Sequence, residues 1–414
     1  MKITSYTFDI TREPLARPFE FKGGRFTEKW HTRTTLLSSG GANAAGIGGL
    51  AILWSDPQVF SEHTETGGNL LMAAVAENAA ARCMGKEYDS PIEAIESLFG
   101  PAHEYGKNVT SNPHLRKTFT LNSLVSLDLA LWKIYAAEKS IDSFDALIPA
   151  ELKTAFTAKQ TILGRIPLIT YNVPPAEIRT LAETGHFLLK IKIGQSGSQK
   201  EMLDKDRARL VEVFDATKDL ESRYTDSGKI EYYLDANGRY ESKERVMELC
   251  SFAESIHMLD RIAILEEPFP EKQKLDVTEL PTRVSADESL HSPEDVHDRI
   301  DLGYGAIALK PAGKGLSLSL LMGAAAYERQ IPCYVADSTC IPELVEWNKN
   351  LAARLPSLPG FRSGFFESNG AQFYKNWRTL IENHPCHGAA WFEARDGAYS
   401  LDDDYYDTSG GVFL

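Results

Sequence analysis

From about residue 165 the chain repeats one pattern, a short apolar run followed by a segment of helical periodicity. Eight such runs occur, near 166–172, 187–193, 230–235, 261–266, 282–287, 305–310, 331–336 and 363–367. Helical periodicity fills the gaps, for example over 200–214, 242–258, 292–301, 315–329 and 341–354. Short buried runs that alternate with helices predict parallel strands. Eight units of this kind predict a closed α/β barrel, the TIM-type (β/α)8 fold.

Residues 1–155 do not share this repeat. Strand-like runs at 2–9, 32–38 and 46–54 are followed by helical patterns at 68–83, 90–99 and 121–139. This order predicts an α+β domain, 1–155, ahead of a barrel domain, 156–372. We expect the aromatic-rich segment 373–414 to fold back toward the first domain. The long polar gap between the second and third apolar runs predicts an insertion at about 195–229.

Five of the apolar runs end in charged residues, and these are Lys190 with Lys192, then Asp235, Glu266, Asp287 and Lys310. A charged side chain is costly to bury without a partner, so one such end means little. Five in a consistent register are hard to explain by packing. In a barrel of this type the catalytic groups lie at the C-terminal ends of the strands. The pattern therefore predicts an enzyme.

The three acids come from successive runs and can converge on one cation. Oxygen ligands of this kind suit Mg²⁺, with Mn²⁺ as a substitute, and leave positions for substrate oxygens. Lys190 and Lys192 share a face of their strand, and neighbouring ammonium groups lower each other's pKa toward that of a general base. The adjacent acids Glu267 and Glu288 are expected at the surface or behind the ligands.

Composition excludes several other classes. A net charge of −14 over 414 residues gives no basic footprint for nucleic acid. The five cysteines are scattered and form no Cys-x-x-Cys pair, which is typical of a reducing compartment. No run is long and apolar enough to span a membrane. We therefore expect a soluble, cytoplasmic protein.

These motifs resemble those of the enolase superfamily, in its muconate lactonizing enzyme and mandelate racemase-like branch, which includes dipeptide epimerases. The matching segments are Lys190-Ile191-Lys192, Asp235-Ala236-Asn237, Glu266-Glu267-Pro268, Asp287-Glu288-Ser289, Lys310 and the helical stretch Val125 to Trp132. Each tripeptide is weak alone, and their order makes the match specific. The similarity covers nearly the whole chain.

The resemblance implies roles for these residues. Lys192 would be one acid/base with Lys190 as its electrostatic helper, and Lys310 would act from the other face. Asp235, Glu266 and Asp287 would bind Mg²⁺. The first domain would cap the barrel, with a lid loop within residues 19–35, and the protein would be a homo-oligomer. Candidate contacts to a small carboxylate substrate are Asn237, Asp337, Ser338, Glu367 and Asn369, with helix capping as the alternative for the segment Asp337 to Thr339.

Two departures bear on the substrate. Where related sequences carry paired glycines after the last lysine, this chain reads Pro311-Ala312-Gly313-Lys314-Gly315. Dipeptide epimerases hold the substrate amine with Asp-x-Asp at the eighth strand, and this chain has Glu367-Ser368-Asn369. Glu367 can still hold an ammonium group, or it is a strand-end surface acid.

Two opposed lysines favour racemisation or epimerisation through an enediolate. The alternatives are β-elimination, as in a dehydratase or an o-succinylbenzoate synthase-like enzyme, and cycloisomerisation. A catalytically silent barrel that binds metal and carboxylate is a further alternative. A metal-dependent hydrolase is disfavoured because no histidine falls at these run ends. Gly46-Ile47-Gly48-Gly49 is only a fragment of a dinucleotide-binding motif and predicts a turn.

Overall fold

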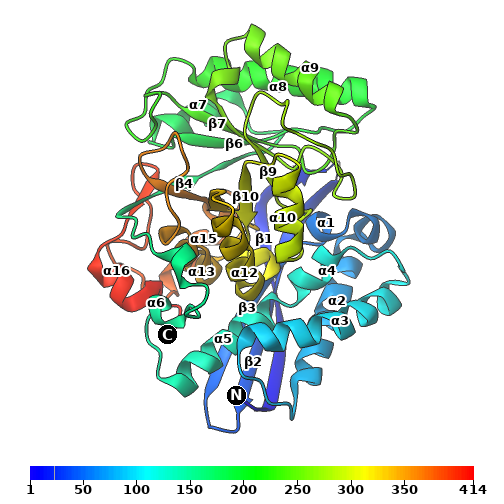
Figure 1. The fold of residues 1–414 in the computed structure, drawn as a ribbon, viewed down its shortest axis with the longest axis vertical. Coiled ribbons are helices and arrows are strands. Elements are labelled where there is room, and N and C mark those ends of the chain that lie inside the picture. Colours follow the sequence, from blue (N-terminus) through cyan, green and yellow to red (C-terminus); the bar gives the residue numbers. More distant parts are fainter. Residues whose placement is uncertain (23) are drawn as a thin grey trace.

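A parallel sheet closed into a barrel forms the centre of the protein, whose computed structural model describes residues 1–22 and 24–414 (Figure 1). In spatial order the strands are β4 (Ile162–Ile166), β12 (Gly364–Glu367), β11 (Cys333–Val335), β10 (Ala306–Leu309), β9 (Val284–Ala286), β8 (Ile262–Glu266), β7 (Glu231–Asp235), β6 (Leu188–Lys192) and β5 (Leu168–Ile169). The two outermost strands of this order, β4 and β5, are consecutive in the chain and separated by Pro167. Together they are one bent strand that pairs with β12 on one side and β6 on the other. This strand closes a ring of eight, which confirms the predicted barrel.

Helices connect most of the strands on the outside of the ring. They are α7 (Pro175–Glu183), α8 (Gln199–Thr217), α9 (Lys243–Ser255), α10 (Pro293–Asp301), α12 (Leu316–Glu328) and α13 (Pro342–Ala353). The connection from β8 to β9 is different, because residues 267–283, all of them described, contain no helix. Prolines at 268, 270 and 281 remove backbone donors there, so the predicted β/α alternation is wrong at this one step. The expected insertion at 195–229 is helix α8 followed by a loop with two isolated bridges, Glu221 to Lys229 and Thr225 to Phe361.

Alternation along the strands separates the barrel interior into an apolar floor and a charged rim. Leu188, Tyr233 and Ile264 belong to one buried cluster inside the ring. Side chains two positions apart on a strand share a face. The residues two steps further on, Lys190 and Asp235 among them, therefore point into the same interior at the C-terminal rim.

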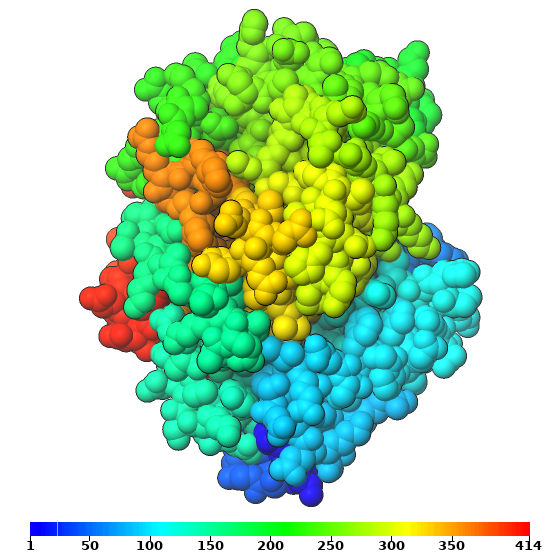
Figure 2. Space-filling model, viewed as in Figure 1, coloured from blue at the N-terminus to red at the C-terminus, as the bar shows by residue number. Residues whose placement is uncertain are grey.

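The N-terminal segments form an antiparallel sheet with helices, packed together at one end of the molecule (Figures 1 and 2, blue to cyan). The sheet contains β1 (Ile3–Phe21), β2 (Gly24–Ser38) and β3 (Asn43–Leu50). The helices are α1 (Ile52–Ser55), α2 (Pro57–Cys83), α3 (Pro91–Thr110), α4 (Lys117–Ser123) and α5 (Val125–Lys139). Residues 19–22 and 24–35, from the segment expected to contain the lid, belong to the long β1–β2 hairpin, and their role as a lid stays a prediction. Pro14 and Pro18 are tolerated in β1 because it is an edge strand.

The glycine motif at residues 46–49 lies within β3, which agrees with the strand-like run predicted from residue 46 and not with the predicted turn. A Cβ at Gly46 would lie 2.2 Å from the carbonyl oxygen of Ser126 and 2.3 Å from the amide nitrogen of Ala130. Glycine is needed here because helix α5 packs directly against the strand backbone.

Helix α5 also fastens the N-terminal part to the barrel. Asp128 accepts hydrogen bonds from the backbone amide and hydroxyl of Ser317, at the start of α12. Gly315, with φ of +93°, leaves the space that the Asp128 carboxylate occupies, since a Cβ there would lie 2.7 Å from its Oδ2. The stretch that resembles the family's connecting helix therefore makes this junction.

The C-terminal segment contacts both parts. Its strand β13 (Ala398–Ser400) pairs antiparallel with β4. Before it, the Lys375 amide donates to the Pro14 carbonyl, and the Tyr374 hydroxyl contacts His31 Nε2 at 3.0 Å. The domain boundaries themselves stay predictions. Among the described residues, no helix combines the length and apolarity required to cross a membrane.

Candidate active site

The charged strand ends meet in one buried cluster at the rim of the barrel. The Lys190 ammonium lies 3.0 Å from Asp235, 3.1 Å from Glu266 and 3.0 Å from Glu367. Its side chain is 2% exposed, and it lies 4.5 Å from the centre of the Tyr233 ring. Charges buried this deeply need partners of opposite sign, which the three carboxylates supply.

Lys192 occupies the next place along the same face of β6. Its ammonium lies 2.6 Å from Asp235 Oδ2 and 2.8 Å from Asn237 Oδ1. The amide group of Asn237 donates in turn to Glu288 Oε1 at 2.9 Å. Asn237 therefore bridges Lys192, at the end of β6, and Glu288, which follows β9.

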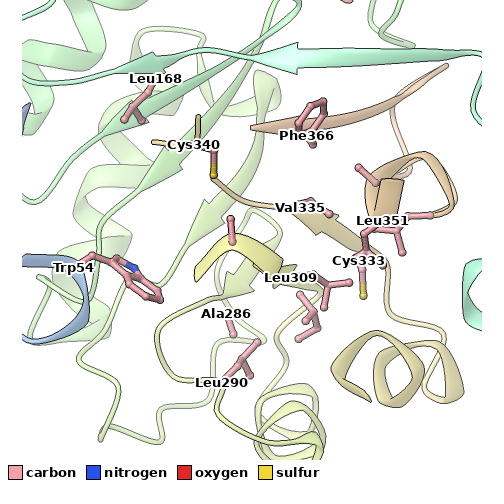
Figure 3. Packing of buried hydrophobic residues seen from close by; sticks show 14 of the residues in the cluster. Trp54, Leu168, Ala286, Leu290, Leu309, Cys333, Val335, Cys340, Leu351 and Phe366 are labelled. Carbon is pink, nitrogen blue, oxygen red and sulfur yellow. The ribbon is translucent and has the colours of Figure 1, made fainter. Parts of the chain in front are cut away.

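Lys310 follows β10 and is held by Asp287, with 2.7 Å between its ammonium and Oδ2. Its ammonium lies 4.1 Å from the centre of the Trp54 ring, a cation–π contact from helix α1. Figure 3 shows Trp54 reaching from the N-terminal part toward the barrel strands. Lys314, one helical turn after Lys310, lies 3.1 Å from Asp287 Oδ1 and donates to the Asp287 carbonyl.

The order of strands places the two candidate bases on facing sides of the rim. Lys192 ends β6 and Lys310 follows β10, and these strands are four positions apart in a ring of eight. The three strands between them, β7, β8 and β9, carry Asp235, Glu266 and Asp287. A small molecule bound over the acids would therefore have a lysine on either side.

Opposite charges shift the pKa values of the cluster. Burial alone would raise the pKa of Asp287, but Lys310 outweighs it together with other nearby lysines, so the pKa lies well below that of an ordinary aspartate. Burial alone would lower the pKa of Lys190, but Asp235 and the other carboxylates raise it well above the ordinary value. The prediction that Lys190 and Lys192 lower each other's pKa is therefore wrong for Lys190, because carboxylates surround it.

Left-handed backbone conformations follow several of the strand ends. Asn237 has φ of +46°, Glu267 +37° and Thr339 +54°. Such angles are costly for residues other than glycine and asparagine, and they are found at functional sites. At Glu267 the turn places the carboxylate where it accepts from the Asp287 amide at 2.7 Å. Burial, followed by Glu288, raises the pKa of Glu267 to about 8.

Carboxylate oxygens of Glu266, Asp287 and Glu288 lie within 4.8 Å of one another. One of the buried oxygens, Glu288 Oε2, accepts no hydrogen bond from any described residue, whereas Asp287 Oδ1 is paired with the Lys314 ammonium at 3.1 Å. A compact set of oxygen donors with an unsatisfied atom fits a hard divalent cation. It shares Glu266 and Asp287 with the predicted ligands, whereas Asp235 is held by the two lysines of β6. Of the two positions expected for Glu267 and Glu288, the surface is wrong, since they are 1% and 2% exposed, and both lie buried beside the cluster.

A cavity of about 50 Å³ opens above this cluster. Apolar groups of the hairpin and helix α1 line one side, including Phe19, Phe21 and Trp54. The other side carries lysines and four predicted substrate contacts: Lys190, Lys192, Lys310, Asp337, Ser338, Glu367 and Asn369. The fifth predicted contact, Asn237, lines a separate hollow with Lys22 and Glu288.

Three lysines of the site were missed by the sequence interpretation. Lys22, at the hairpin turn, contacts Glu288 at 2.9 Å. Lys29, on β2, lines the cavity. Neither lysine could be identified as a site residue from the sequence. Both belong to the β1–β2 hairpin, whose position over the barrel depends on the tertiary fold. Lys314 could have been identified from the sequence, since its i, i+4 spacing from Lys310 places the two lysines on one side of a helical turn.

No family model and no curated protein matches this chain. Solved structures do. A mandelate racemase/muconate lactonizing protein from Herpetosiphon aurantiacus has a TM-score of 0.68 at 17% identity, over 97% of this chain and 96% of that one. This chain has the same fold. The fold inferred from the family resemblance is thereby confirmed.

Two further structures extend the comparison to named activities. A dipeptide epimerase from Enterococcus faecalis, complexed with Mg and the dipeptide L-Leu-L-Tyr, has a TM-score of 0.65 at 16% identity, covering 97% of this chain and 98% of its own. A racemase from Streptomyces coelicolor with bound magnesium has a TM-score of 0.63 at 15% identity, with 97% and 94% covered. Identities this low establish a common fold.

Proposed function

We propose that this protein is an enzyme of the enolase superfamily that removes the proton α to a substrate carboxylate, with Mg²⁺ as its cofactor. The observation that carries the proposal is the arrangement of the rim, where lysines on facing strands flank three buried carboxylates. Racemisation or epimerisation is the reaction this arrangement supports best, because a base is available on either side of the reacting carbon.

Lys192 is proposed as one acid/base and Lys310 as the other. Each is already oriented by contacts that do not depend on substrate, Lys192 by Asp235 and Asn237, and Lys310 by Asp287 and the Trp54 ring. A proton removed by one lysine and returned by the other inverts the α-carbon. Lys190 stays between the carboxylates and adds positive charge beside the developing enediolate.

Asp235, Glu266 and Asp287 are proposed to hold the metal, with Glu288 close behind them. When bound, Mg²⁺ stabilises negative charge on the substrate carboxylate. The close approach of carboxylate oxygens from Glu266, Asp287 and Glu288, within 4.8 Å of one another, supports this assignment. So do the similarly folded epimerase and racemase solved with magnesium.

The hairpin and helix α1 are proposed to shield the reacting centre from water. Phe19 and Phe21 are each 5% exposed, and the Lys192 ammonium lies 5.2 Å from the centre of the Phe21 ring. An apolar cover of this kind strengthens the charge interactions beneath it.

Deuterium uptake at the α-carbon from D₂O, followed by mass spectrometry, tests the proposal. Pooled dipeptides, N-acyl amino acids and sugar acids are incubated with protein and Mg²⁺, with and without EDTA. We expect uptake that EDTA abolishes and that falls by about 10²–10⁴-fold in Lys192→Ala and in Lys310→Ala. Lys229→Ala, an exposed lysine paired with Glu221, is the control.

Unchanged exchange in both site variants would refute the assignment. Product analysis then separates the reactions that share the first step. Inverted stereochemistry at unchanged mass supports racemisation or epimerisation, and a new alkene or ring indicates elimination or cycloisomerisation.

A further inference from the structure

Lys29 differs from the other lysines of the cavity in having no acidic partner. Its side chain is 2% exposed, and its ammonium donates to Ser338 Oγ over 3.4 Å, a long hydrogen bond. Across residues 1–22 and 24–414, no carboxylate oxygen lies within 4.0 Å of it. A buried charge without a counterion is strongly unfavourable.

The groups that act on Lys29 from the surrounding elements do not neutralise it. Cys340 and Asp337 follow β11, and Lys310 follows β10. Lys310 carries positive charge of its own. Asp337 Oδ2 accepts instead from the backbone amide of Asn369 at 2.9 Å, and burial, followed by Glu367, raises the pKa of Asp337.

The acid of the eighth strand is engaged elsewhere. Glu367 Oε2 accepts from Lys190 and from the backbone amide of Asp337, each at 3.0 Å. Its Oε1 accepts from the Asn369 side chain at 3.0 Å. Glu367 therefore does not offer a free carboxylate to a substrate ammonium group, although such a role was one of its predicted possibilities.

We propose that Lys29 binds a second carboxylate of the substrate, at the end of the molecule away from the reacting carbon, so that the substrates are dicarboxylic acids. This inference rests on the proposed function, which places the first carboxylate over Asp235, Glu266 and Asp287. A ligand carboxylate would give the Lys29 ammonium a charge-assisted hydrogen bond. The Ser338 hydroxyl, already 3.4 Å away, is placed to donate to the same group.

Binding of matched simple acids, measured by isothermal titration calorimetry in the presence of Mg²⁺, tests the inference without turnover. Each of three chain lengths is measured with a methyl, a carboxylate or an ammonium end. The sets are butyrate, succinate and 4-aminobutyrate; valerate, glutarate and 5-aminovalerate; and hexanoate, adipate and 6-aminohexanoate. At the length that fits, we expect the dicarboxylate to bind at least tenfold more tightly than either partner. Lys29→Met should remove that preference and leave binding of the methyl-ended acid unchanged.

Equal binding within every set, tighter binding of an amino acid, or a preference that persists in Lys29→Met would overturn the inference. The order of affinities measured with the wild-type protein tests the inference even if Lys29→Met folds poorly. Lys29→Gln provides a second variant with a neutral side chain. A Lys29-dependent preference in a protein without α-proton exchange would contradict the proposed function and retain the subsite. Exchange without the preference would retain the function and remove the subsite.

Discussion

The two lysine-bearing regions of the cavity balance positive charge in different ways. At the strand ends, Lys190, Lys192 and Lys310 each have a carboxylate oxygen within 3.1 Å. On β2, the ammonium of Lys29 has a neutral hydroxyl at 3.4 Å. Both regions are equally buried, so depth does not explain the difference.

At the strand ends, carboxylates of the protein itself balance the charge of the lysines. At Lys29, a ligand would have to supply the balancing negative charge. The strand-end cluster is neutralised internally, and its members orient one another before any substrate binds. Lys29 destabilises the fold in the absence of an anion. Destabilising groups of this kind are retained at functional sites because activity depends on them.

The largest expected effect is the loss of an acid from the strand-end cluster. Asp287→Asn leaves the ammonium groups of Lys310 and Lys314 buried without their carboxylate. Removing one partner of a buried ion pair lowers the free energy of unfolding by about 3–5 kcal/mol. Urea unfolding at pH 7 measures this change.

Asp215→Asn is the matched control, because Asp215 pairs with Lys218 while both side chains are more than half exposed. Exposed pairs contribute little to stability. Equal stability of the two variants would show that the buried cluster is not held together by its charges.

The second effect has the opposite sign. Lys29→Met removes an uncompensated charge and keeps the aliphatic stem, so the variant is expected to be more stable than wild type at pH 7. Burial lowers the pKa of Lys29 from 10.5 to about 8. A difference of this size corresponds to about 3 kcal/mol.

The sign of the pH dependence follows from the same difference. Between pH 8 and 10.5 the unfolded chain holds the Lys29 proton and the folded protein does not, so wild-type stability increases with pH across this window. Below pH 8 the full penalty remains. Urea unfolding at pH 7 and pH 10 should show the gap between wild type and Lys29→Met closing, with exposed Lys229→Met as control. A constant gap would contradict the shifted pKa.

Much of the strand-end site could be predicted from the sequence because parallel strands give each residue a fixed place. Lys192, Asp235 and Glu266 end successive strands, and the ring brings strand ends together whatever the connecting loops do. The acid that completes the compact oxygen set was less predictable. Glu288 follows its strand and reaches the cluster through a turn, which strand periodicity does not describe.

The N-terminal part was less predictable, for a related physical reason. Among the described residues its sheet is not hydrogen-bonded to the barrel sheet, so strand register does not predict where Lys29 lies relative to the barrel. The sequence therefore did not place this side chain in the cavity. The glycines at 46–49 had the composition of a turn, but they form a strand because helix α5 requires a flat surface there. Contacts between distant segments determined both outcomes.

The third effect is a loss of metal affinity, and it tests whether Asp235 or Glu288 is the third metal ligand. Asp235→Asn is expected to weaken Mn²⁺ binding by about 100-fold, and Glu288→Gln by about tenfold, as outer partners of metal ligands contribute about 10–100-fold. Titration followed by the electron paramagnetic resonance of free Mn²⁺ measures both. The reverse order would make Glu288 the third ligand and Asp235 the partner of the β6 lysines.

The smallest effect tests whether Ser338 balances the charge of Lys29. A hydroxyl at 3.4 Å lies beyond the usual length of a hydrogen bond from nitrogen to oxygen, so Ser338→Ala should lower the free energy of unfolding by about 1 kcal/mol or less. The double variant with Lys29→Met should then be as stable as Lys29→Met alone. A much larger loss in Ser338→Ala would mean that the hydroxyl is a strong partner of the ammonium. Lys29 would then be satisfied within the protein, as the strand-end lysines are, and its need for an external anion would disappear.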